Sequence, residues 1–112
     1  NANYYDKHFS KISEIIIPPR LKNYKIVYHL YSIFVKNRNQ LLKYCIKKGI
    51  EVKIHYPTPI YLQKALAFRK YKKGDFPVTD RHSTKVITFP CDQHLNKKQL
   101  NYIINTVKKF YS

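Results

Sequence analysis

Apolar residues in the first seventeen positions recur at the spacing of a helix with one buried face. The stripe consists of Tyr5, His8, Phe9, Ile12, Ile15 and Ile16. Pro18 and Pro19 follow directly, and proline breaks a helix because it lacks the amide hydrogen and its ring clashes with the preceding turn. The pattern predicts a helix within residues 1–17 that ends at the proline pair.

A strand and a capped helix are predicted next. The run from Ile26 to Val35 is rich in β-branched and aromatic residues and contains neither glycine nor proline. Both of its faces are apolar, so we expect a central strand and not an edge strand. Asn37 followed by Gln40 is typical of an N-terminal helix cap, and the apolar positions after it keep a helical spacing up to Gly49.

The middle of the chain alternates between a short strand and an irregular loop. Polar and apolar residues alternate over residues 51–54, which predicts a strand with Val52 and Ile54 facing the core. Residues 55–59 contain two prolines, which lack ladder donors and push their predecessors out of the helical region. We therefore expect a stiffened loop there.

The second half of the chain adds further elements. The patterns predict short helices near residues 62–69 and 79–85, a turn at 73–75, a strand at 86–90 and a final helix capped by Asn96 and Gln99. The fold class is therefore α+β: two layers, with a few-stranded mixed or antiparallel sheet and helices packed on one side. No repeat or flexible linker divides the chain, so we expect residues 1–112 to form a single domain.

The net charge of +16 points, by itself, to an anionic partner such as nucleic acid. Nearly all of that charge is lysine, in a chain that is also rich in Ile, Asn and Tyr. These residues share AT-rich codons, so genome composition explains the lysine content without selection for an anionic ligand. Arginine, which makes bidentate contacts to guanine and phosphate, stands only at Arg20, Arg38, Arg69 and Arg81.

Several classes of site lack a motif in this sequence. The histidines and acidic residues show no zinc spacing, no serine or cysteine lies in a nucleophile motif, and His29 is expected to be a satisfied histidine inside the central strand. Cys45 and Cys91 form no CxxC pair, which favours a reducing cytoplasm. The apolar runs are too short to predict a membrane span.

Five segments, taken together, carry a resemblance to a known family. They are NANYYDKHFSKI, VYHLYSIFVKNRNQLLKY, KKGIEVKIHYPTPIYLQKA, YKKGDFPVTD and VITFPCDQHLNKKQLNYIINTVKKF. In this order they resemble the C-terminal small domain of the DegT/DnrJ/EryC1/StrS aminotransferases, which transaminate keto groups on nucleotide-linked sugars. The segments cover nearly the whole chain, and residues 1–17 match the family's connecting helix.

The resemblance implies that the cofactor and the catalytic lysine belong to a large domain that is not part of this chain. In the family, the large domain binds pyridoxal phosphate (PLP) through a lysine, so this chain is expected to carry no cofactor-binding or catalytic residue. The family's enzymes are dimers, and the partners implied are the large domain, the dimer partner and a nucleotide-linked sugar. His55 and Tyr56, at the family's IHYP position, are the expected substrate-binding residues.

Some positions depart from the family pattern, and the function is left with one main hypothesis and two alternatives. Lys53 stands where a small residue usually precedes the IHYP motif, and Cys91-Asp92-Gln93 replaces a more apolar segment. The first hypothesis is a fragment of a nucleotide-sugar aminotransferase of cell-surface polysaccharide or antigen biosynthesis, inactive alone. The alternatives are a small basic nucleic-acid-binding module and an intact enzyme whose cofactor domain is a separate polypeptide.

Overall fold

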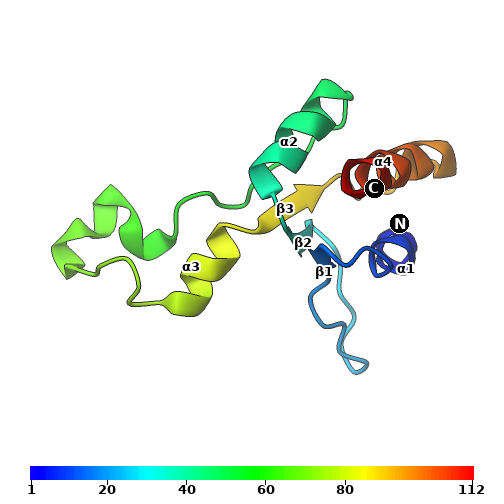
Figure 1. The fold of residues 1–112 in the computed structure, drawn as a ribbon. Coiled ribbons are helices and arrows are strands. Elements are labelled where there is room, and N and C mark those ends of the chain that lie inside the picture. Colours follow the sequence, from blue (N-terminus) through cyan, green and yellow to red (C-terminus); the bar gives the residue numbers. More distant parts are fainter.

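The computed structural model describes residues 1–112 as a small antiparallel sheet with helices (Figure 1). The helices are α1 (Ala2–Phe9), α2 (Arg38–Lys47), α3 (Pro77–Ser83) and α4 (Lys97–Tyr111), with 3-10 segments η1 (Ile60–Leu62) and η2 (Lys64–Arg69). The strands are β1 (Ile15–Ile16), β2 (Tyr31–Val35) and β3 (Val86–Phe89), in the order β1-β2-β3. The predicted α+β class is confirmed, and both strand pairs are antiparallel.

The central strand β2 divides its side chains between two faces of the sheet. Tyr31, Ile33 and Val35 are buried on one face, whereas Ser32 and Phe34 are half-buried on the other. Because β2 pairs with both β1 and β3, the prediction that this strand is central is confirmed. Its register places Ile15, Ile87 and Phe89 on the same face as Ile33, and the buried Thr88 on the face of Ser32.

The buried face packs against α1, α2 and α4. A core of 17 residues joins the buried strand positions to these three helices. Tyr5 and Phe9 of α1 stack with ring centroids 5.3 Å apart, and Phe9 lies 5.5 Å from Phe89 of β3. At the start of α4, Asn96 accepts from the Gln99 amide at 2.9 Å while the Gln99 side chain accepts from the Asn96 amide, as the predicted cap requires.

The helix predicted over residues 1–17 is too long. Helix α1 ends at Phe9, and Ile15–Ile16 forms strand β1, paired with Phe34 and Val35 of β2. β-branched side chains prefer extended backbone, and the pairing with β2 supplies hydrogen bonds that a continued helix would forgo. The helical spacing of Ile15 and Ile16 therefore does not reflect a helix. In the strand, Ile15 faces the core and Ile16 is exposed.

The other predicted boundaries also change at particular residues. The predicted strand 26–35 begins only at Tyr31, because Tyr28 has a φ of 50° and interrupts the extended backbone. Asn37 does precede α2, but its side chain makes no capping hydrogen bond and its own φ is 53°. The predicted strand at 51–54 is reduced to one bridge, in which Lys53 and Thr88 exchange both backbone hydrogen bonds.

Residues 57–83, which we call the arm, project away from the sheet and carry α3 at their end (Figure 1). The radius of gyration is 15.5 Å, whereas a compact domain of this length has about 13 Å. The arm is held by its own cluster, in which Tyr61 contacts Tyr71 and Phe76 and donates a hydrogen bond to Asp80. The sequence predicted that the helices pack on one side of the sheet. Helix α3 lies in the arm instead and does not join α1, α2 and α4 on the buried face.

Candidate functional site

The second face of the sheet carries the candidate site. Ser32 and Phe34 of β2 project from this face, and Thr88 and Val86 of β3 stand opposite them in the register. Helices α1, α2 and α4 cover the other side, whereas loop 55–59 and the arm approach this face. Because side chains alternate between the two faces of a strand, this face carries one polar pair, Ser32 and Thr88, and one apolar pair, Phe34 and Val86.

His55 is fixed on the polar pair. Its Nδ1 lies 3.0 Å from the Thr88 hydroxyl, which in turn lies 3.0 Å from the Ser32 hydroxyl. Thr88 is buried and His55 is half-buried, and the Lys53 to Thr88 bridge sets the backbone two residues before the histidine. The imidazole is therefore held through Nδ1, while its Nε2 has no hydrogen-bond partner within the chain.

Tyr56 lies beside His55 at the edge of a cavity. The two rings meet edge to face with centroids 5.2 Å apart, and the Tyr56 side chain is 67% exposed with no hydrogen bond to its hydroxyl. The cavity measures about 360 Å³ and is lined by both residues together with Thr79, His82 and others. The two side chains predicted to bind substrate thus share one hollow, with a ring nitrogen and a phenol free to contact a ligand.

The sequence did not indicate three further residues of this site. Thr88 orients the imidazole, while Phe34 and His82 form a stacked pair with ring centroids 4.2 Å apart on the cavity wall. Period-two alternation in residues 86–89 could have placed Thr88 opposite Ser32. Nothing in the sequence could have brought His82 of the arm onto Phe34.

His29 lies at another cavity and not inside the central strand, where the sequence predicted it. It is exposed in a bend just before β2. The cavity there measures about 510 Å³ and includes His55 and Thr88 on its wall together with Lys53. The side chain of Lys53 is 63% exposed and paired with Glu51 at 2.7 Å, so this lysine is solvated and ion-paired.

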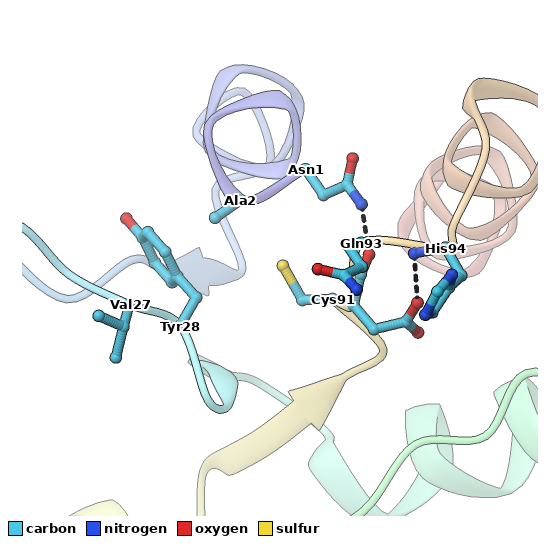
Figure 2. A pocket seen from close by; sticks show the side chains of 8 residues that line it. Asn1, Ala2, Val27, Tyr28, Cys91, Gln93 and His94 are labelled. Atoms are coloured by element: carbon cyan, nitrogen blue, oxygen red, sulfur yellow. Dashed lines mark hydrogen bonds between the residues drawn. The ribbon is translucent and has the colours of Figure 1, made fainter.

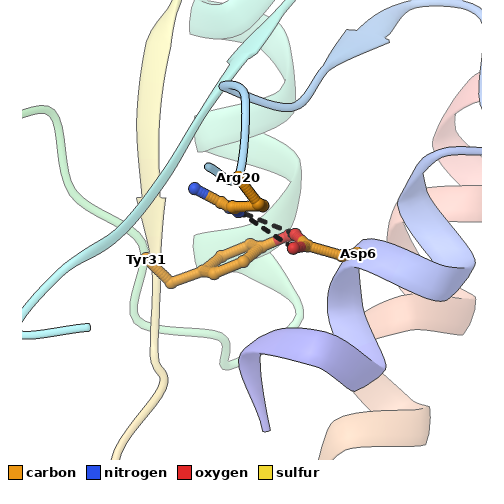
Figure 3. Close-up of polar contacts among 3 residues, drawn as sticks. All are labelled: Asp6, Arg20 and Tyr31. Carbon is orange, nitrogen blue, oxygen red and sulfur yellow. Dashed lines mark hydrogen bonds and ion pairs between the residues drawn. The ribbon is translucent and has the colours of Figure 1, made fainter. Parts of the chain in front are cut away.

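A half-buried ion pair fixes the connection between β1 and β2 (Figure 3). The Asp6 carboxylate accepts hydrogen bonds from Arg20 Nε at 2.9 Å, from Arg20 Nη2 at 3.1 Å and from the Tyr31 hydroxyl at 2.7 Å. Burial by itself would raise the pKa of Asp6, but these hydrogen bonds and the arginine charge outweigh it and lower the pKa. The same contact ties the loop that follows Pro19 to helix α1.

A third cavity lies between the start of α1 and residues 91–94 (Figure 2). It measures about 570 Å³, and the Asn1 side chain closes one side by donating to the Asp92 carbonyl at 2.6 Å. Burial raises the pKa of the Cys91 thiol, which keeps it protonated at neutral pH. Neither this thiol nor the neighbouring backbone contacts provide an activated nucleophile.

The cavities around these residues do not supply the groups that bind PLP. The cavity beside His55 and Tyr56 is lined by neither a lysine nor a carboxylate, the cavity at Cys91 lacks a lysine, and Lys53 at the His29 cavity is exposed and ion-paired with Glu51. A PLP site of the aminotransferase type needs a lysine for the Schiff base and an acidic partner for the pyridine nitrogen. No step of a reaction can therefore be assigned to that group on these residues.

No group of three or more His, Cys, Asp or Glu side chains is arranged to hold a metal ion. None of the helices has the length and apolar character that crossing a bilayer requires.

Comparison with known proteins identifies the family of the chain. Residues 1–108 match the DegT/DnrJ/EryC1/StrS aminotransferase family. The erythromycin biosynthesis sensory transduction protein EryC1 of Saccharopolyspora erythraea is 28% identical over 96% of this chain and 29% of its own length. The dTDP-3-amino-3,6-dideoxy-alpha-D-galactopyranose transaminase of Aneurinibacillus thermoaerophilus is 26% identical over 97% of this chain and 29% of its own.

Solved structures agree with the sequence matches. DesV of S. venezuelae, in complex with a ketimine intermediate, superposes with a TM-score of 0.93 and 24% identity over 99% of this chain and 30% of its own. The putative sugar aminotransferase Spr1654 of Streptococcus pneumoniae, in its PMP form, gives 0.83 and 26% over 96% of this chain and 28% of its own. The chain therefore spans about 30% of the length of these relatives. It belongs to the DegT/DnrJ/EryC1/StrS aminotransferase family.

Proposed function

We propose that this chain is the small-domain part of a PLP-dependent nucleotide-sugar aminotransferase that acts in the cytoplasm in cell-surface polysaccharide or antigen biosynthesis. The observation that carries the proposal is the family match over residues 1–108, which accounts for almost the whole chain. Relatives matched over this region include transaminases named for dTDP-linked amino sugars. The alternative of a basic nucleic-acid module receives no comparable support.

In this proposal, His55 and Tyr56 contact the nucleotide-linked sugar. The Thr88 hydroxyl holds the imidazole at Nδ1, so that Nε2 points to a ligand at little entropic cost. The Tyr56 phenol is exposed and can donate to a sugar hydroxyl or to the diphosphate. Both groups bind and orient substrate, and neither is assigned a proton transfer.

PLP is held by residues outside this chain in the same proposal, so the chain alone is silent in transamination. The partners are the cofactor domain and a second subunit of the enzyme. The arm carries exposed apolar side chains suited to such a partner surface, among them Ile60, Phe68 and Val78. The isolated chain is accordingly expected to self-associate in light scattering at high concentration, and a strict monomer would contradict this part.

The first test is the intact mass of the natural polypeptide in its source cell, which should be about three times the 13.5 kDa of this chain. That polypeptide, supplied with PLP, glutamate and a dTDP-linked keto sugar, should form the amino sugar, whereas the 112-residue chain should not. A natural product of 13.5 kDa without a complementary cofactor polypeptide, or no transamination by the full polypeptide, would refute the proposed function.

The role of Tyr56 is tested separately in the full polypeptide. Tyr56→Phe removes one hydrogen bond of about 1 kcal/mol, so KM for the nucleotide sugar should rise about fivefold with little change in kcat. Tyr24→Phe is the matched control, because Tyr24 is 72% exposed and lines none of the cavities described above. Equal KM values for the two variants would remove Tyr56 from the substrate site while leaving the activity itself untouched.

A further inference from the structure

A cavity of about 650 Å³ lies between strand β1, the proline pair and the end of α3. It borders the candidate site, with which it shares only the stacked pair Phe34 and His82. His55 and Tyr56 do not line it. The full lining is Ile16, Pro18, Pro19, Phe34, Arg81, His82 and Lys85.

The polar lining of this cavity is entirely basic. Arg81, His82 and Lys85 are the polar residues that line it, and no carboxylate does. The two ion pairs of the chain, Arg20 with Asp6 and Lys53 with Glu51, lie elsewhere. Three basic side chains therefore meet here without a protein counter-charge, which leaves room for an anion.

These basic groups are not needed to cap helix α3. The carbonyls at its C-terminal end already have donors: Asp80 O accepts from Ser83 Oγ, Arg81 O from Thr84 Oγ1, His82 O from Lys85 N, and Ser83 O from Arg38 Nη1, at 2.8 to 3.0 Å. Cationic side chains at a helix end commonly bind such orphan carbonyls. Here the side-chain nitrogens of Arg81 and Lys85 stay available.

The other wall of the cavity is apolar. Pro18 and Pro19 form a rigid edge, and Ile16 is 60% exposed beside Phe34, its partner on β2. The Phe34 ring is stacked at 27° to the His82 ring, so the aromatic surface is already ordered before any ligand binds. A planar apolar group can lie on this wall at low entropic cost.

We propose that this cavity binds an aromatic phosphate monoester. The phosphate contacts Arg81 and Lys85 and accepts a hydrogen bond from His82, while the ring lies against Ile16 and the proline pair. A guanidinium and an ammonium together match a dianionic phosphate better than a carboxylate, because they supply donors to three oxygens. The site is distinct from the substrate role proposed for His55 and Tyr56.

Phenyl phosphate is the probe, titrated into the 15N-labelled chain and followed by NMR. The amides of residues 81–85 should shift, and inorganic phosphate and benzoate should each bind more weakly. Arg81→Gln/Lys85→Gln should weaken binding at least tenfold, equivalent to about 1.4 kcal/mol at 25 °C. Lys43→Gln/Lys47→Gln removes the same charge from the exposed side of α2 and should change the Kd less than twofold.

Three outcomes would overturn the proposal. An equal loss in the α2 control variant would mean that phenyl phosphate responds to net charge alone. Inorganic phosphate binding as tightly as phenyl phosphate would mean that the apolar wall contributes nothing. Shifts confined to residues outside the cavity would place the ligand elsewhere, and the spectrum of each variant shows directly that the fold is retained.

Discussion

The contact among Asp6, Arg20 and Tyr31 makes a sharp prediction about stability. Asp6→Asn keeps the shape of the side chain but removes its charge and turns one acceptor oxygen into a donor group. Asp6 Oδ1 accepts from both the Tyr31 hydroxyl and Arg20 Nη2, and Oδ2 accepts from Arg20 Nε, so the asparagine NH2 group must face one of these two sets of donors. Because Tyr31 is completely buried, its hydroxyl cannot turn to water instead.

The size of the effect follows from how exposed each partner is. Hydrogen bonds to charged groups contribute about 1.5–3 kcal/mol, and an unsatisfied buried hydroxyl costs about 1–3 kcal/mol. The Arg20 side chain is 29% exposed and can regain water, so its share is discounted. Asp6→Asn should therefore lower the free energy of unfolding by about 2 kcal/mol, a large part of a typical total of about 5–15 kcal/mol.

The dependence on pH follows from the lowered pKa of Asp6. A carboxyl whose folded pKa lies below its unfolded value of about 3.9 stabilises the fold above that value. This stabilisation is lost as the pH falls through the folded pKa. The difference between the wild type and Asp6→Asn should thus be full at pH 7 and shrink below about pH 4.

Urea unfolding at pH 7 and at pH 3 measures both quantities. The control is Glu51→Gln, since Glu51 pairs with Lys53 at 2.7 Å but its side chain is 76% exposed, so the urea midpoint should not move. Two results would refute the reasoning: an unchanged midpoint for Asp6→Asn at pH 7, or a loss that persists undiminished at pH 3. The first would mean that water replaces the three hydrogen bonds, and the second would mean that the loss does not depend on the charge of Asp6.

Three further predictions concern single side chains. Thr88→Val removes the partner of the His55 ring and should cost about 1–2 kcal/mol in urea unfolding and broaden the imidazole NMR signals of His55. Asn96→Ala breaks the capping box and should cost about 1 kcal/mol, whereas Asn105→Ala, in the exposed middle of α4, should not destabilise the chain. Burial raises the pKa of Cys45 to about 11, so its thiol should react with a disulfide reagent at pH 8 only when urea unfolds the chain.

Much of the local structure was predictable because its causes lie in short stretches of sequence. The capping box at Asn96 joins residues three positions apart, and α4 keeps one apolar face throughout its length. Gly49, with a φ of 74°, follows α2 where the sequence predicted its end. The central position of β2 was also predictable, since its run of β-branched and aromatic residues without glycine or proline favours a strand with a neighbour on each side.

The errors arise where distant residues decide the outcome. Ile15 and Ile16 have the spacing of a helix, yet Val35 and Phe34 of β2 supply their hydrogen-bonding partners from about twenty positions away. Tyr28 interrupts an otherwise uniform β-forming run, and no local pattern distinguishes it from its neighbours. Propensity is a weak prior in both places, and tertiary pairing overrides it.

The candidate site divides along the same line. His55 and Tyr56 were predicted from the family resemblance, at the IHYP position of a proline-stiffened loop, and their contact with substrate stays a prediction. Thr88 and His82 come from a strand and from the arm, and only the register of β3 and the path of the arm place them there. The predicted ligand-binding residues of the candidate site are therefore neighbours in the sequence. The residues that position them are brought together only by the fold.

The two faces of the sheet differ in how they are covered, which leaves one of them open to a ligand. Helices α1, α2 and α4 bury the other face, and the hydrophobic core that they form includes none of Ser32, Phe34 and Thr88. The second face is therefore free to hold loosely packed groups from loop 55–59 and the arm. Replacing Phe34 by Leu tests this: it should disturb the His82 stack and phenyl phosphate binding while shifting the urea midpoint less than Ile33→Val on the buried face. A larger loss of stability from the Phe34 variant would show that the second face is part of the core after all.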